Sequence, residues 1–154
     1  MIQPLADAAG EHSISFPLEI DVTAAGRPPI PLPAEFRYER SDPYAVCLAL
    51  GAPTTASVDW VFARSLLAEG LRRPAGIGDV QVTPRRHSAA GHPSPSDTVR
   101  ILLRTRDGAA ATLEVRASAV TAFLRRTDVM VAPGTEHHHL DLDRVTTRLT
   151  AGGP

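Results

Sequence analysis

Residues 44–71 read YAVCLALGAPTTASVDWVFARSLLAEGL, and this stretch decides the fold. Over Tyr44–Leu50, large apolar residues alternate with small ones, which predicts a central strand that is apolar on both faces. A turn with glycine and proline at residues 51–53 leads to Val58–Phe62, whose β-branched and aromatic residues predict the next strand. Helical spacing follows at Leu66–Leu71. Strands joined by a short turn and followed by a helix indicate an α+β domain with a largely antiparallel sheet.

The end of this helix is predicted at Gly70, in a left-handed cap that lets Leu71 fold back on Leu66. Upstream, apolar residues at every second position of Ile14–Val22 predict a half-buried strand, and Pro17 places that strand at a sheet edge.

Ala24–Pro33 is rich in proline, so we expect a stiff surface connector there. Alternation resumes at Phe36 and Tyr38, which predicts another strand.

Downstream, Val80 and Val82 predict a fifth strand, halted by Pro84, and the aperiodic stretch Arg85–Asp97 predicts a long exposed loop. A hairpin follows, in which the strands around Ile101 and Leu113 are joined through Asp107-Gly108.

Ser118 is the expected N-cap of a helix with three apolar residues on one face, namely Val120, Phe123 and Leu124. Arg125 and Arg126 fit the end of that helix, where its dipole favours cations. Spacing also suggests a last helix over Leu142–Leu149, capped by Asp141.

The whole chain therefore predicts about seven strands and two or three helices in one domain. Residues 1–13 are expected to be a flexible extension, 14–149 the domain and 150–154 a frayed tail.

Composition limits the classes of function. The formal net charge is −1 and all 16 basic residues are arginine, so the chain lacks the positive field that carries non-specific nucleic-acid binding. One cysteine, Cys47, allows no internal disulfide. No stretch approaches the roughly 20 apolar residues of a membrane helix, so we expect a cytoplasmic protein.

Motifs for chemistry are weak. His137–His139, with Glu136, Asp141 and Asp143 nearby, matches no zinc spacing; if the run is extended, His137 and His139 share a face, but we favour solvated histidines and expect no metal or cofactor. Cys47 is expected in the core, where a thiol is inert.

The segment Gly76–Asp79 precedes a strand, so it predicts a turn and no phosphate loop. The carboxylates Glu69, Asp79 and Glu136 have no partner at a recognisable spacing and are interpreted as solvated charges. Aromatic residues could stack bases, but core packing is favoured for all three of the candidates: Trp60, Phe62 and Phe123.

One set of blocks is far more specific. In order along the chain, they are Asp42-Pro43-Tyr44-Ala45-Val46, residues 58–64 (VDWVFAR), residues 66–71 (LLAEGL), Arg73-Pro74, Gly76, Gly78-Asp79-Val80, residues 123–127 (FLRRT), Pro133-Gly134-Thr135-Glu136 and residues 140–143 (LDLD). They resemble the signature of the SsgA-like sporulation and cell-division proteins of actinobacteria. The family positions, interpreted as mainly structural, are Asp42, Pro43, Tyr44, Trp60, Phe62, Leu67, Glu69, Gly70, Pro74, Gly78, Phe123, Pro133, Gly134 and Glu136.

The resemblance implies a non-enzymatic regulator of sporulation-specific division that acts through protein contacts. It implies septum-site selection, recruitment of the tubulin-like FtsZ, septal wall remodelling and concentration at the division septum. It also implies a Whirly-like sheet domain that forms an oligomer, a trimer, with FtsZ or another SsgA-like protein as partner and the membrane reached only indirectly.

Partner contact is predicted at two arginine pairs, which suit acidic surfaces: Arg72, Arg73, Arg125 and Arg126. Ordinary solvated arginine remains the alternative for each pair. A second hypothesis is single-stranded nucleic-acid binding through the Whirly-like architecture, against which the balanced charge speaks. No small-molecule substrate is expected, since no group of side chains matches a catalytic motif.

Overall fold

A computed structural model describes residues 12–51 and 57–140. Its elements, in chain order, are β1 (Ser13–Ala24), β2 (Ile30–Glu39), β3 (Ala45–Leu50), β4 (Val58–Ala63), α1 (Arg64–Gly70), β5 (Val80–Arg85), β6 (Thr98–Arg104), β7 (Ala110–Arg116), α2 (Ala117–Met130) and a 3₁₀ turn, η1 (Glu136–His139). The predicted order of four strands, a short helix, three strands and one or two helices is confirmed as far as α2.

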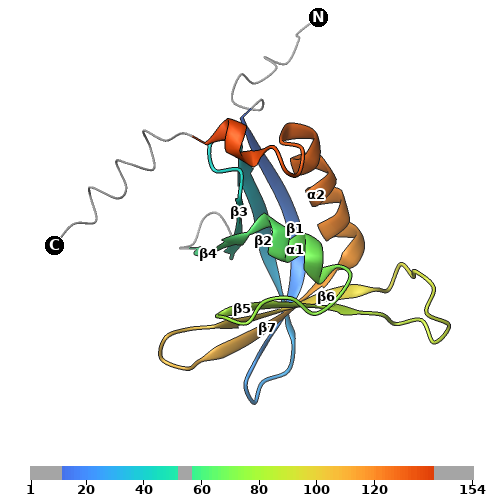
Figure 1. The fold of residues 1–154 in the computed structure, drawn as a ribbon. Coiled ribbons are helices and arrows are strands. Elements are labelled where there is room, and N and C mark those ends of the chain that lie inside the picture. The colour runs from blue at the N-terminus through green and yellow to red at the C-terminus, as the bar shows by residue number, and fades with distance from the viewer. Residues whose placement is uncertain (1–11, 52–56, 141–154) are drawn as a thin grey trace, which may run out of the picture.

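The seven strands form one antiparallel sheet in the order β4-β3-β2-β1-β7-β6-β5. The sheet is strongly curled: β5, β6 and β7 run across the direction of β1, β2 and β3, and α2 lies along β1 (Figure 1). β1 makes the bend because it pairs with β2 over Ser13–Val22, whereas only its end, Asp21–Ala24, pairs with β7.

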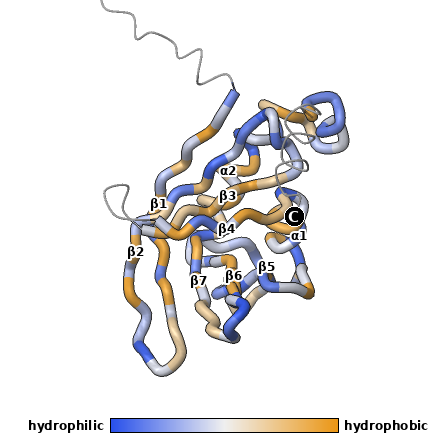
Figure 2. Tube along the Cα trace, turned by 90° about the vertical axis from the view of Figure 1, so that its left-hand side faces the viewer, coloured by the Kyte–Doolittle hydropathy of each residue, from blue (hydrophilic) through white to orange (hydrophobic). Residues whose placement is uncertain are grey.

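The core lies between the concave face of the sheet and α2. Phe123 of α2 stacks on Phe36 of β2 with ring centroids 4.9 Å apart. The ring of Phe16 on β1 lies 6.0 Å from that of Phe123, also between centroids. Val120 and Leu124 are buried beside Phe123, so the predicted apolar face of this helix is confirmed. Apolar and polar segments alternate along the strands, as expected for a sheet with one buried face (Figure 2).

The prediction that Pro17 marks an edge strand is wrong for the strand order, because β1 lies between β2 and β7. The backbone explains how the proline is accommodated. Arg40 N donates to His12 O at 2.8 Å, so the even-numbered residues of β1 hydrogen-bond to β2. The nitrogen of Pro17 therefore faces away from β2, on a side where β7 does not reach.

The predicted connector Ala24–Pro33 is also wrong. The strand β2 begins at Ile30, and its paired region includes two of the prolines of that segment, Pro31 and Pro33. Pro31 and Pro33 are opposite Asp21 and Glu19, positions that do not bond across this ladder. Three prolines in two strands thus cost no hydrogen bond between β1 and β2. On the other side of β2, Pro33 accepts from Gly51 N at 2.9 Å but has no N–H to donate in return. Only the turn at residues 25–29 remains outside the hairpin.

Gly70 is not in the predicted left-handed conformation. Gly26, Gly51, Gly76, Gly91, Gly108 and Gly134 have positive φ, and Gly70 is not among them. After Gly70, Leu71 keeps a right-handed φ of −69°. The glycine is needed for packing, since a Cβ at Gly70 would lie 2.1 Å from Cγ1 of Val82 on β5.

The predicted start of the long helix is corrected as well. Its N-cap is Arg116 without a side-chain hydrogen bond, and Ser118 lies inside the first turn. Because α2 continues to Met130, Arg125 and Arg126 precede its last turn and do not complement the C-terminal dipole.

Other predictions hold or need small changes. The hairpin β6–β7, with Gly108 at φ +88°, and the loop between β5 and β6 are confirmed. Pro84 does not halt β5, which runs to Arg85 as an edge strand.

The predicted helix Leu142–Leu149 and its cap Asp141 lie outside the described residues. The division of the chain into 1–13, 14–149 and 150–154 stays a prediction. Within the part of the chain that the structure describes, no helix has the length and apolarity to cross a bilayer.

Replacing Gly70 with alanine should lower the free energy of unfolding by about 1 to 3 kcal/mol, because the new methyl group would overlap Val82. The matched control is Gly78→Ala, where an added Cβ meets nothing within 4 Å. Urea unfolding followed by circular dichroism measures both variants. Equal stability of the two would contradict the packing role of Gly70.

Candidate functional site

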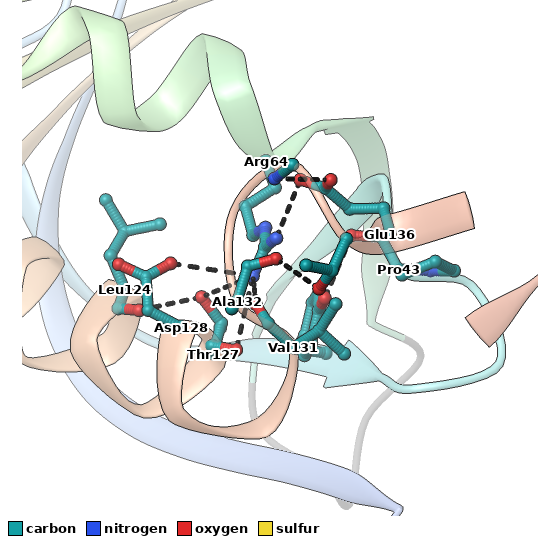
Figure 3. A network of polar contacts seen from close by, with 11 residues as sticks. Pro43, Arg64, Leu124, Thr127, Asp128, Val131, Ala132 and Glu136 are labelled. Carbon is teal, nitrogen blue, oxygen red and sulfur yellow. Dashed lines mark hydrogen bonds and ion pairs between the residues drawn. The ribbon is translucent and has the colours of Figure 1, made fainter. Parts of the chain in front are cut away.

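The most connected polar side chain is Arg64, which is the first residue of α1 and is buried. Its Nη1 donates to the carbonyl oxygens of Val131 at 2.8 Å and Thr127 at 3.2 Å, at the end of α2. Its Nη2 donates to Oε1 of Glu136 at 2.8 Å (Figure 3). Asp128 lies 3.5 Å from Nη1. One guanidinium therefore joins the β4–α1 junction to the end of α2 and the turn beyond it.

Two groups beside this guanidinium have shifted pKa values. Hydrogen bonds from the backbone N–H of Glu136 itself and from Arg64 hold the pKa of the Glu136 carboxyl below its usual range. Burial raises the pKa of Tyr38 to about 12. The Tyr38 hydroxyl donates to the carbonyl of Pro43 at 2.9 Å, and the Arg64 guanidinium carbon is 5.2 Å from the ring centroid. The site thus holds an ionised carboxylate and a neutral phenol.

A cleft of about 640 Å³, here called the helix cleft, opens over this network. It is lined by Arg64, Ser65, Ala68, Glu69, Arg72, Arg73, Asp128, Pro133 and Glu136. Arg73 forms an ion pair with Glu69 one helical turn earlier, at 2.9 Å. Both positive and negative side chains line the cleft, and such a lining suits charged groups of a partner protein.

The four predicted partner-binding arginines are all exposed, but they do not form one site. Arg72 and Arg73 follow α1 and line the helix cleft. Arg125 and Arg126 lie on the solvent side of α2 and are not among the residues that line it. The structure therefore assigns only the first pair to the cleft.

Arg64 was missed as a site residue, and its partner Glu136 was wrongly interpreted as a solvated charge. The two residues lie 72 positions apart, so no spacing rule connects them. The one sequence signal was an arginine directly after the apolar strand β4. The prediction that Glu69 has no partner is also wrong, because it forms an ion pair with Arg73. The i,i+4 spacing of these two residues is a signal that the sequence contains.

Cys47 is not in the core, contrary to the prediction. It is half-buried on the convex face of β3, opposite Arg37 of β2 and Val61 of β4. Burial raises the pKa of its thiol, which disfavours the nucleophilic thiolate.

His137–His139 form the turn η1 and not an extended run. The rings of His137 and His138 are 4.0 Å apart between centroids. Among residues 12–51 and 57–140, no three histidine, cysteine or acidic side chains are grouped to hold a metal ion. Asp141 and Asp143 lie outside these ranges.

Several signature residues have structural contacts. Phe62, Leu67 and Phe123 are buried in the core, as predicted for the two phenylalanines. Trp60 packs against the core and remains partly exposed. The segment Gly76–Asp79 is a turn before β5, as predicted.

Replacing Arg64 with methionine should lower the free energy of unfolding by about 3 to 5 kcal/mol, because Glu136 and two carbonyl groups lose their buried donor. Arg73→Met is the control, since it breaks an exposed pair and should cost at most about 1 kcal/mol. Chemical unfolding of both variants at neutral pH provides the measurement, and similar losses would refute the assigned role.

The lowered pKa of Glu136 predicts a pH dependence. A carboxyl whose pKa is lower in the folded state stabilises the fold above its ordinary pKa, and this contribution is lost as the pH falls through the folded value. The wild type should therefore lose more stability than Glu136→Gln between pH 7 and pH 3, as measured by thermal unfolding. Parallel curves for the two proteins would show that Glu136 does not contribute to acid sensitivity.

Comparison with known proteins agrees with this architecture. The family described as "Streptomyces sporulation and cell division protein, SsgA" matches residues 32–136. The sporulation-specific cell division protein SsgB of Streptomyces coelicolor is 42% identical over 139 residues, covering 90% of this chain and 96% of that protein. SsgB of Kineococcus radiotolerans is 45% identical, with 86% and 81% covered.

Two solved structures are similar. An SsgA-like sporulation-specific cell division protein from Thermobifida fusca has a TM-score of 0.73 at 30% identity, covering 88% of this chain and 94% of that one. A Streptomyces coelicolor SsgB structure has a TM-score of 0.71 at 43% identity, with 83% and 95% covered. The chain belongs to the SsgA family of sporulation and cell division proteins, a family without enzymatic activity.

Proposed function

We propose that this protein regulates sporulation-specific cell division by binding other proteins, in septum-site selection, FtsZ recruitment and septal wall remodelling. The observation that carries the proposal is the similarity to SsgB of Streptomyces coelicolor along 90% of this chain. The protein acts in the cytoplasm at the division septum and reaches the membrane only through its partners.

The surface supports binding through charge. Arg72 and Arg73 stand at the rim of a cleft whose floor contains the fixed pair Arg64–Glu136. Arginine forms bidentate bonds with carboxylates, so an acidic segment of a partner fits the first pair. Arg125 and Arg126 offer a second basic position on α2. FtsZ and another SsgA-like protein are the proposed partners, and the active form is proposed to be a Whirly-like trimer.

The second hypothesis, single-stranded nucleic-acid binding, finds little support in the charges of the sheet. Arg85 and Arg100 lie 4.0 Å and 2.8 Å from the same carboxylate, Glu114. The charged residues that line the hollow beside them are three carboxylates, Glu19, Asp21 and Glu114, and one cation, Arg116. These carboxylates would repel phosphate.

Charge reversal tests the proposed contact. The variants Arg72→Glu/Arg73→Glu and Arg125→Glu/Arg126→Glu, alone and combined, should reduce co-localisation with division rings in sporulating hyphae, because acidic partner groups would be repelled. The control Arg27→Glu/Arg106→Glu reverses two exposed arginines in hairpin turns. Normal localisation of a folded quadruple variant would eliminate the arginine pairs as the contact.

Nucleic-acid binding is tested by filter retention of labelled oligothymidylate across a salt series. We expect that retention of the oligonucleotide does not rise steeply as the salt concentration is lowered. A steep rise requires contacts between phosphates and a cationic surface. A steep salt dependence with the purified protein would favour the second hypothesis.

A further inference from the structure

The two edge strands of the sheet, β4 and β5, differ in their availability for pairing. On the open side of β5, the N–H and C=O of Val82 are bonded to Ala75, at 2.9 and 2.8 Å. The next position with the same orientation is Pro84, which has no N–H. This edge is therefore blocked against a further strand.

The outer edge of β4 is unpaired among the residues that the structure describes. Arg64 N donates to Tyr44 O at 2.7 Å, which continues the β3–β4 ladder and shows that the even-numbered residues of β4 bond to β3. Asp59 and Val61 consequently direct their backbone N–H and C=O groups away from β3. Within residues 12–51 and 57–140, no strand pairs with β4 on that side.

Side chains along this edge are apolar and accessible. Val58 is 58% exposed and Val61 is 64% exposed, and Trp60 is partly exposed between them. Charged side chains, proline and bulges usually protect an edge strand; β4 contains no proline, and Asp59 is its one charged residue. An open apolar edge of this kind is the template that β-strand addition uses.

The adjoining convex face selects the charge of the occupant. A hollow of about 250 Å³ beside β4 contains three carboxylates, Glu39, Asp42 and Asp59, against one cation, Arg37. Arg37 lies 3.7 Å from Asp59, whose side chain remains 47% exposed. A second copy paired through β4 would place two such acidic faces side by side, whereas a basic segment would be attracted.

We propose that the free edge of β4 binds an extended basic segment of another protein as an eighth, antiparallel strand. A basic residue of that segment stands opposite Asp59, and apolar residues stand opposite Val61 and Trp60. Reading along the partner, the pattern is apolar, apolar, basic, because antiparallel strands run in opposite directions. This surface goes beyond the proposed function: it selects the opposite charge from the arginine pairs and does not include them.

The test uses the capped peptide Ser-Thr-Val-Val-Arg-Val-Thr-Ser and the same peptide with Glu in place of Arg. Trp60 is the only tryptophan of the chain, so its emission reports occupancy of the edge and should shift to shorter wavelength as the ring is covered. We expect the Arg peptide to bind more tightly than the Glu peptide. Asp59→Arg should reverse that preference, each change being about fivefold for a cross-strand charge pair.

Val61→Pro removes the central outward N–H and leaves the β3 ladder intact, so it should weaken the Arg peptide by at least about fivefold. Asp79→Arg, an equal charge change next to β5, is the control and should leave binding unchanged. In the unmodified protein, the amide signals of Asp59 and Val61 should become protected from hydrogen exchange when the peptide is added, a measurement that needs no folded variant.

Absence of binding at millimolar peptide, equal affinity for both peptides, or unprotected Asp59 and Val61 amides would overturn the proposal. A dimer of the protein, detected by sedimentation and dissociated by Val61→Pro, would also overturn it, because the occupant of the edge would then be a second copy. The peptide affinities and the amide protection do not depend on whether the arginine-pair variants change localisation. The β4 proposal and the arginine-pair proposal are therefore tested separately.

Discussion

The buried guanidinium of Arg64 is the interaction on which the arrangement of the helices depends. Arg64 is the first residue of α1, and its guanidinium donates to the carbonyl oxygens of Thr127 and Val131 at the end of α2. It also pairs with Glu136 in the turn that follows. A buried cation is costly unless it is paired and hydrogen-bonded, so each of these three segments has to keep its place once the others are formed. The helix cleft is a consequence of this constraint, since the same residue forms its floor.

The curl of the sheet has an equally local cause. β1 is shared unequally, with β2 over Ser13–Val22 and with β7 only over Asp21–Ala24. Pro17, Pro31 and Pro33 occupy positions that do not bond across the β1–β2 ladder, so the hairpin keeps its bonds although it contains prolines. The curled sheet then wraps around Phe123 of α2, and Gly70 lets α1 approach β5 closely.

These features separate charges on the surface. One basic pair, Arg72–Arg73, follows α1 and the other, Arg125–Arg126, lies on α2, whereas carboxylates gather beside β4 on the convex face of the sheet. A chain with a formal net charge of −1 can thus present surfaces of opposite sign to different partners. Such surfaces fit the proposed role, in which the protein acts in cell division by binding other proteins.

The sequence by itself determined the order of the elements, the α+β class, the buried face of α2 and the family, because alternation, helical spacing and ordered motif blocks are local properties. It did not determine the Arg64–Glu136 pair, the packing role of Gly70, the half-buried position of Cys47 or the place of Pro17 within the sheet. Each of these depends on which distant segments become neighbours: Glu136 is 72 residues from Arg64, and the effect of a proline depends on the strand that its nitrogen faces. Only the tertiary structure decides such pairings, because the free energy of a buried charge or a close backbone approach is set by surroundings that the local pattern does not contain.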